Sequence, residues 1–101
     1  MKNADVSALT AETLDPGLAP PLRALWWLRK GGFAIGPEWR KAHELCQSRE
    51  GDPDHDLVHA LTHWIEGDMG NAAYWYRRAG TAGKASVIAA EWQRIAKLLL
   101  A

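Results

Sequence analysis

Three histidines and one glutamate recur at helical spacing in the stretch HDLVHALTHWIEGD. His55, His59, His63 and Glu66 stand at positions i, i+4, i+8 and i+11. Two imidazoles at i and i+4 project from one face of a helix and can hold a divalent metal ion such as zinc. Glu66 lies three residues after His63 and could supply a third ligand. The row lacks the glutamate that directly follows the first histidine in metalloprotease helices, so the spacing alone does not specify a metal.

The same row has two other interpretations. Structural hydrogen bonding on a polar helix face needs no ligand, and a His/Glu pair could transfer protons on a substrate. In stacked helical hairpins, the positions of His59 and His63 face the second helix of the hairpin. His43 belongs to an apolar stripe on the preceding helix and could meet them. We therefore expect His59 and His63 to be at least partly buried, and His55, in the first helical turn, to lie in water.

The stretch YWYRR joins aromatic rings to two cations, a combination that can grip a nucleic-acid base or a phosphate. A structural interpretation is preferred here. Trp75 and Tyr76 are expected in the core, and Arg77 and Arg78 are expected to pair with the acidic run at residues 52–56. The two arginines also remain candidates for a protein-interaction surface.

Adjacent Trp26 and Trp27 form a second candidate interaction surface. Neighbours on a helix diverge by about 100°, so one core face cannot fully bury both indoles. We expect one of them to meet either the N-terminal arm or a second subunit. Cys46 lies one turn after His43, but a small thiol in an apolar stripe is expected to be a core residue rather than a nucleophile.

Proline and glycine divide the chain into five predicted helices after a short N-terminal arm. Proline stands at the first turn of the first three helices, and glycine follows the first four. β-Branched residues do not alternate with polar ones, so no strand is expected. Residues 1–20 are predicted to be a mobile or loosely docked arm with a short turn of helix at residues 6–14. Residues 21–101 form a single helical domain, with helices near 21–30, 37–50, 53–66, 69–79 and 84–100.

An internal repeat relates the first two helices to the next two. The period is close to that of tetratricopeptide repeats, and GDMGNAAYWYRRAG is similar to the turn and second helix of such repeats. The predicted fold is therefore all-α, with two stacked helical hairpins closed by a fifth helix whose apolar stripe runs from residue 85 to residue 99. The repeated pairs, each 36 positions apart, are Ala24 and Ala60, Leu25 and Leu61, Gly31 and Gly67, and Trp39 and Trp75.

The longer run HWIEGDMGNAAYWYRRAG, together with the preceding ALW, AHELCQ and VHALTH segments, carries a second resemblance. The pattern resembles a family of small uncharacterised helical proteins from bacteria and fungi and covers residues 24–80. This sequence departs from the family by an insertion at residues 33–36. The resemblance implies the helical fold and draws attention to the same histidines, but it implies no activity.

The overall composition excludes some classes of partner. The chain has 101 residues with 12 basic and 12 acidic side chains, so no bulk charge directs it to nucleic acid or to a membrane. It has a single cysteine, no signal-peptide pattern and no long apolar run, which predicts a cytoplasmic protein.

The preferred function is a helical protein-interaction module that binds a protein partner or forms a homo-oligomer. One alternative is a metal-binding protein that uses His59 and His63 with Glu66 or His43, for which zinc is the expected cofactor. Another alternative is a small enzyme with a His/Glu acid–base pair. The sequence favours a non-enzymatic role and indicates no cofactor other than this metal.

Overall fold

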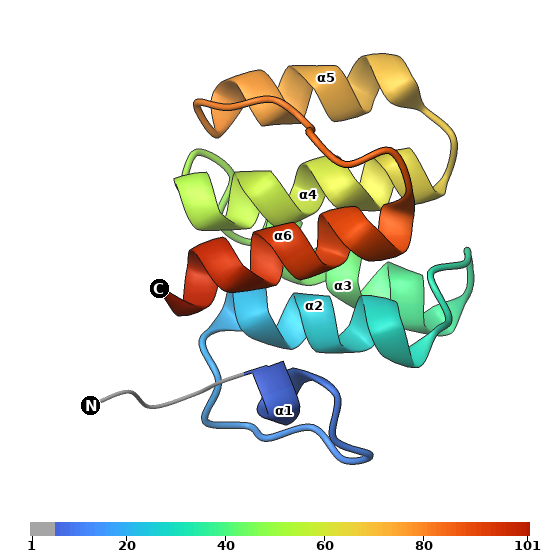
Figure 1. Cartoon of the computed structure of the whole chain (residues 1–101), viewed down its shortest axis with the longest axis vertical. Coiled ribbons are helices and arrows are strands. Elements are labelled where there is room, and N and C mark those ends of the chain that lie inside the picture. The colour runs from blue at the N-terminus through green and yellow to red at the C-terminus, as the bar shows by residue number, and fades with distance from the viewer. Residues whose placement is uncertain (1–5) are drawn as a thin grey trace.

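Helices make up all of the regular structure in residues 6–101, the part of the chain that the computed structural model describes. The hairpins α2–α3 (Pro20–Lys30 and Pro37–Gln47) and α4–α5 (Pro53–Ile65 and Met69–Arg78) lie one above the other, α3 packs on α4, and α6 (Ile88–Leu100) lies alongside α2 and α4 (Figure 1). The predicted all-α architecture of two stacked hairpins and a closing helix is confirmed. The helices are α1 (Val6–Leu9), α2 (Pro20–Lys30), α3 (Pro37–Gln47), α4 (Pro53–Ile65), α5 (Met69–Arg78) and α6 (Ile88–Leu100).

Local sequence signals explain where the helices of the second hairpin begin and end. The side chains of Asp52 and Asp68 each accept a hydrogen bond from the backbone N–H three residues later, which caps α4 and α5. Gly67 and Gly80 follow these helices with φ values of 86° and 85°, a left-handed conformation that glycine adopts without a steric penalty. The ends of both helices are therefore set by aspartate caps and glycine stops that can be recognised in the sequence.

The N-terminal arm is docked on the helical core over its described part. Helix α1 ends at Leu9, five residues before the predicted end, and the segment that follows runs along α2. Leu9 and Leu18 are both buried in the main hydrophobic cluster. Of the two predicted states of the arm, mobile or loosely docked, the structure shows a docked arm from residue 6 onwards, because its leucines contribute to the core. Residues 1–5 of the predicted arm lie outside the described part.

The arm also accounts for the adjacent tryptophans. The Trp26 indole Nε1 donates a hydrogen bond to the carbonyl oxygen of Ala11 at 2.9 Å, and the ring is buried beneath the arm. Trp27 is half-buried, and the Lys41 ammonium lies 5.3 Å from the centre of its ring. The expectation that one indole meets the arm is confirmed, and Trp26 is not part of the exposed surface.

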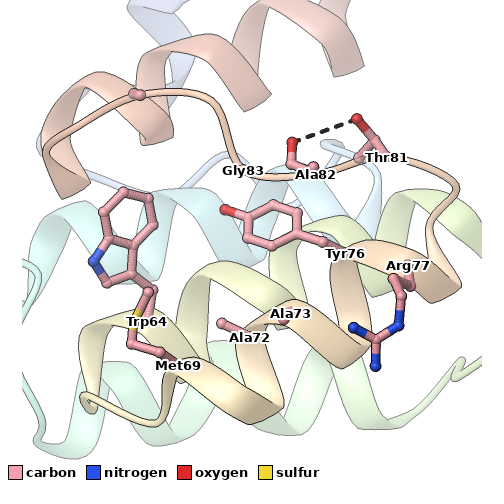
Figure 2. Close-up of a pocket in the computed structure, with 10 residues that line it drawn as sticks. Trp64, Met69, Ala72, Ala73, Tyr76, Arg77, Thr81, Ala82 and Gly83 are labelled. Carbon is pink, nitrogen blue, oxygen red and sulfur yellow. Dashed lines mark hydrogen bonds between the residues drawn. The ribbon is translucent and has the colours of Figure 1, made fainter.

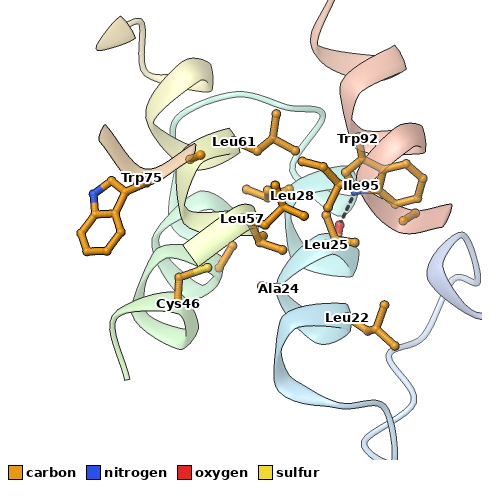
Figure 3. Packing of buried hydrophobic residues seen from close by; sticks show 14 of the residues in the cluster. Leu22, Ala24, Leu25, Leu28, Cys46, Leu57, Leu61, Trp75, Trp92 and Ile95 are labelled. Atoms are coloured by element: carbon orange, nitrogen blue, oxygen red, sulfur yellow. Dashed lines mark hydrogen bonds between the residues drawn. The ribbon is translucent and has the colours of Figure 1, made fainter. Parts of the chain in front are cut away.

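Helix α6 closes the core. Figure 3 shows Leu25 and Leu28 of α2, Leu61 of α4, and Trp92 and Ile95 of α6 converging on one apolar cluster. The Trp92 indole Nε1 donates to the carbonyl oxygen of Leu25 at 2.8 Å, so the last helix is joined to the first hairpin by packing and by a buried hydrogen bond.

The predicted stripe of α6 is wrong at its N-terminal end. The helix begins only at Ile88, so Ala85 precedes it, and Ala89 is exposed. Glu91 instead occupies a buried position on the core side of the helix. The apolar periodicity alone did not reveal this carboxylate.

Buried Glu91 is satisfied by four neighbours. It accepts hydrogen bonds from the Tyr76 hydroxyl at 2.7 Å, from the Arg94 guanidinium at 2.6 and 2.9 Å, and from the backbone N–H groups of Lys84 and Ala85. Burial alone would raise the pKa of Glu91, but these hydrogen bonds outweigh burial and lower the pKa to about 2. The carboxylate therefore fastens the segment before α6 to both α5 and α6.

The insertion in the first hairpin also contacts α6. Gly32 and Phe33 adopt φ values of 70° and 56°, and Phe33 is the only non-glycine residue with positive φ among the described residues. This conformation costs an L-residue about 1–2 kcal/mol. The Phe33 ring lies 6.2 Å from the Trp92 ring, centre to centre, and this aromatic packing offsets the cost.

We predict that Trp92→Ala lowers the free energy of unfolding by about 3–5 kcal/mol, because it removes a buried indole and the partner of the Leu25 carbonyl. Urea denaturation followed by circular dichroism measures the change. Leu98→Ala, at an exposed position of the same helix, is the matched control and should unfold like the wild type. An unchanged denaturation curve for Trp92→Ala would show that α6 is a peripheral tail.

Candidate metal centre

Three imidazoles meet where the two hairpins join. His43 comes from α3, and His59 and His63 come from successive turns of α4; these three residues are called the histidine cluster below. One ligand nitrogen from each residue lies within 4.8 Å of the other two. The ring centres are 4.8 Å apart for His43 and His59, 5.2 Å for His43 and His63, and 4.9 Å for His59 and His63.

The helix geometry explains this convergence. Residues four apart on a helix lie on the same face, so His59 and His63 both point toward α3. Because α3 packs directly on α4, His43 in the middle of α3 faces the gap between them. His59 and His63 are buried and His43 is half-buried. The predicted burial of His59 and His63 at the helix interface is confirmed, and so is the predicted approach of His43.

His43 and His59 face each other through their Nε2 atoms. The Nε2 atoms of His43 and His59 are 3.1 Å apart. His63 uses Nδ1 to contact the Glu66 carboxylate at 2.5 Å, which leaves its Nε2 unengaged by that contact. Glu66, predicted as a direct ligand, thus lies behind His63; a separate set of possible ligands joins His63, Glu66 and Asp68 at the exposed end of α4.

Two tryptophans enclose the cluster. The Trp39 ring stacks on His43 at 4.8 Å with an interplanar angle of 10°, and the Trp75 ring stacks on His59 at 4.0 Å with an angle of 18°. The Trp39 indole Nε1 also donates to the carbonyl oxygen of Thr62 at 2.9 Å, which fixes α3 against α4. The sequence analysis treated these tryptophans only as core residues. Trp39 and Trp75 occupy equivalent positions of the internal repeat, 36 residues apart, and this equivalence was the signal that could have placed both next to the histidine cluster.

The environment keeps the inner imidazoles neutral. Burial, and the neighbouring His43 and His63, lower the pKa of His59 to about 3. Burial and His63 likewise lower the pKa of His43, and the Glu66 carboxylate only partly opposes this. A neutral imidazole retains one unprotonated ring nitrogen, which is the state that a metal ligand requires.

The proton on His59 has two positions with different consequences. If Nε2 carries it, Nε2–H donates to His43 and Nδ1 is a buried acceptor; if Nδ1 carries it, Nε2 is free to ligate. Nδ1 of His59 is buried and has no hydrogen-bond partner among the described residues. The second tautomer therefore leaves a buried N–H without an acceptor, a cost that any bound metal would have to offset.

His55 lies outside the cluster and is not in water. It is buried, and its Nδ1 contacts the Asp52 carboxylate at 2.6 Å. The prediction of a solvated His55 is wrong because α2 and α6 pack on α4. His55, the beginning of α2 and Leu99 near the end of α6 line a surface pocket of about 250 Å³. The hydrogen bonds from His55 lower the pKa of Asp52.

Arg77 and Arg78 do not pair with the acidic run at residues 52–56. No ion pair between them occurs among residues 6–101; the Arg78 guanidinium instead donates to the Tyr74 hydroxyl at 2.8 Å and lies over the Trp75 ring. The prediction of direct ion pairs is wrong because Arg78 finds aromatic partners on its own helix. The prediction that Trp75 is a core residue is confirmed.

Cys46 is fully buried in the core cluster, as predicted. Burial and the nearby Asp56 raise the pKa of its thiol, so the reactive thiolate is suppressed. The neighbouring Glu44 is exposed and cannot orient His43. The chemistry of this region therefore depends on the imidazoles.

No protein-family model, curated protein or solved structure significantly matches this chain. The resemblance to the uncharacterised bacterial and fungal family, and the relation to tetratricopeptide repeats, stay predictions. Within residues 6–101, no helix combines the length and the apolar character that crossing a membrane requires.

We predict that the histidine cluster makes the fold less stable in mild acid. The folded-state pKa of His59 is about 3 against a usual 6.5, so between these values the unfolded chain binds a proton that the folded chain does not. The free energy of unfolding is therefore unaffected by His59 above pH 6.5, and it decreases as the pH falls from 6.5 toward 3.

Between pH 6.5 and about 5.5 carboxylates remain largely ionised, so a comparison of the wild type with a His59 variant in this window reports on imidazole protonation. Urea midpoints across the window should fall for the wild type and change less for His59→Gln. NMR of the imidazoles should show His59 still neutral at the lower end of the window. A protonated His59 at that pH, or equal slopes for both proteins, would contradict the prediction.

Proposed function

We propose that this protein binds a divalent metal ion, with zinc as the first candidate, through His43, His59 and His63. The observation that carries the proposal is the convergence of three imidazole nitrogens within 4.8 Å from two facing helices. Imidazole is a ligand suited to zinc, copper and nickel. In this proposal the ion lies between the two hairpins, where α3 and α4 both contribute ligand side chains.

The distances between the imidazoles support this assignment. Zinc–nitrogen bonds of 2.0–2.1 Å in tetrahedral geometry separate two ligand atoms by about 3.3 Å. The Nε2 atoms of His43 and His59 are 3.1 Å apart, so a small rotation of either ring would admit an ion between them. His63 offers the third nitrogen, which lies within 4.8 Å of the ligand nitrogens of His43 and His59.

The protonation state of the imidazoles also suits metal ligation. Burial lowers the pKa of His59 and His43, so both are neutral at pH 7 and need not lose a proton to bind. The contact of Glu66 with His63 Nδ1 reproduces the carboxylate–histidine arrangement that orients many metal ligands. Three neutral ligands and the unpaired Nδ1–H of His59 predict weaker binding than in closed four-ligand structural sites.

Metal binding is preferred to the two other functions for specific reasons. The protein-interaction hypothesis used Trp26 as a surface residue, but the N-terminal arm covers this side chain. The acid–base hypothesis uses only the His63–Glu66 pair and leaves the other two imidazoles without a role. Three ligands around an ion would leave one coordination position, at half-buried His43, for water or an exchangeable ligand.

We predict one zinc ion per chain by isothermal titration calorimetry of the full chain at pH 7.5. His43→Gln should abolish the binding, and Glu66→Gln should weaken it about 10- to 100-fold through loss of ligand orientation. His55→Gln is the matched control, since His55 lies outside the cluster, and it should bind zinc like the wild type.

Acid should release the ion, because protons compete for the same nitrogens. NMR of the imidazoles should show zinc-dependent shifts at the histidine cluster and none at His55. The proposal is abandoned if millimolar zinc produces neither heat nor these shifts, or if His43→Gln binds zinc as well as the wild type does.

A further inference from the structure

A groove on the far side of α5 is separate from the histidine cluster. It has a volume of about 420 Å³ and lies between α5 and the extended segment at residues 81–85, with the end of α4 closing one side (Figure 2). This volume falls in the range of small-molecule sites. Its lining is Trp64, Met69, Ala72, Ala73, Tyr76, Arg77, Thr81, Ala82, Gly83 and Ala85.

The groove has one apolar end and one cationic end. Trp64 and Met69 lie together at one end, Ala72 and Ala73 form a flat middle, and Arg77 lies at the opposite end (Figure 2). Met69 is 53% exposed, so its side chain is accessible to a ligand in the groove.

Arg77 is the only charged residue of the lining, and no acidic side chain lines the groove. Among residues 6–101 no side-chain hydrogen bond or ion pair to Arg77 is found, in contrast to Arg78, which bonds to Tyr74. A guanidinium without a partner at the end of an apolar groove is complementary to a carboxylate on an apolar molecule, because it can donate two parallel hydrogen bonds.

The walls of the groove are already rigid. Glu91 holds the backbone N–H groups of Lys84 and Ala85 and the hydroxyl of Tyr76, and Arg94 donates to the carbonyl oxygen of Ala82. A side chain at position 83 would approach the Tyr76 ring to 3.0 Å, so Gly83 permits the segment to lie directly on that ring. A ligand would therefore meet a formed surface and would not have to order a loop.

We propose that this groove binds a small hydrophobic monocarboxylate, an aliphatic or aromatic acid whose apolar part lies on Trp64 and Met69 and whose carboxylate meets Arg77. A peptide strand is a poorer occupant. The N–H groups of Lys84 and Ala85 already bond to Glu91, so the extended segment offers few free donors for strand pairing.

The test uses octanoate as the charged probe and 1-octanol as its uncharged counterpart, titrated into the full-length protein and followed by NMR. Octanoate should shift the signals of Trp64, Met69 and Ala73, and octanol should bind more weakly. Arg77→Gln should weaken octanoate binding by about tenfold or more, as expected for loss of a charge-assisted hydrogen bond.

Two further variants control the test. Arg78→Gln removes a neighbouring charge that points to Tyr74 and should leave octanoate binding unchanged. Ala73→Phe places a ring in the groove from an exposed helix position and should abolish binding while circular dichroism shows an intact fold.

The proposal is overturned if octanoate causes no shifts at millimolar concentration. It is also overturned if octanoate and octanol bind equally and neither responds to Arg77→Gln, since the groove would then be a non-specific apolar surface. The proposal is likewise overturned if a peptide competes with octanoate and binds with higher affinity than any carboxylate tested, since the occupant of the groove would then be a protein partner.

Discussion

Helix α4 is covered by α2, α3, α5 and α6, and the rest of the structure depends on how its polar side chains are accommodated without water. Nine consecutive residues, from His55 to His63, are buried. Most of the polar side chains find protein partners: Thr62 donates to the carbonyl oxygen of His59, and Asp56 accepts from the N–H of Gly51. Three buried atoms, His55 Nε2, Asp56 Oδ2 and His59 Nδ1, have no hydrogen-bond partner among residues 6–101. A central helix of this kind rigidifies its surroundings and concentrates polar chemistry in the interior. The neutral imidazoles follow directly from this burial.

The histidine cluster lies where the two hairpins meet, with His43 from one and His59 and His63 from the other. A ligand that binds all three imidazoles would therefore also hold the hairpins together. Its binding free energy would stabilise the packing of the two hairpins. Protonation acts in the opposite sense, because like charges on His43 and on His59 or His63, whose ring centres are 4.8 and 5.2 Å from that of His43, would push α3 and α4 apart. The stacked rings of Trp39 and Trp75 limit how far the imidazoles can rotate in either case.

Much of this architecture could be predicted, because capping residues and helix-stop glycines act locally and are visible in the sequence. Burial of His59 and His63 followed from the hairpin register alone. The state of His55 could not be predicted, since it depends on Leu99, which the fold brings to the start of α4. The burial of Glu91 was missed for a related reason. A carboxylate is buried only where several donors converge, and the donors Tyr76 and Arg94 come from different helices. Local signals specified the helices, but the partners of buried charges arise from tertiary packing.

The hydrogen bond from Trp92 to Leu25 joins residues 67 positions apart, whereas each hairpin is built from neighbouring segments. During synthesis the hairpins can form while α6 is still inside the ribosome, but the apolar surface around Leu25, Leu28 and Leu61 then has no cover. Completion of this core has to wait for residues 88–100. The nascent chain consequently passes through a partly folded state with exposed apolar surface, and slow translation of residues 88–100 would lengthen its exposure to aggregation and to chaperones.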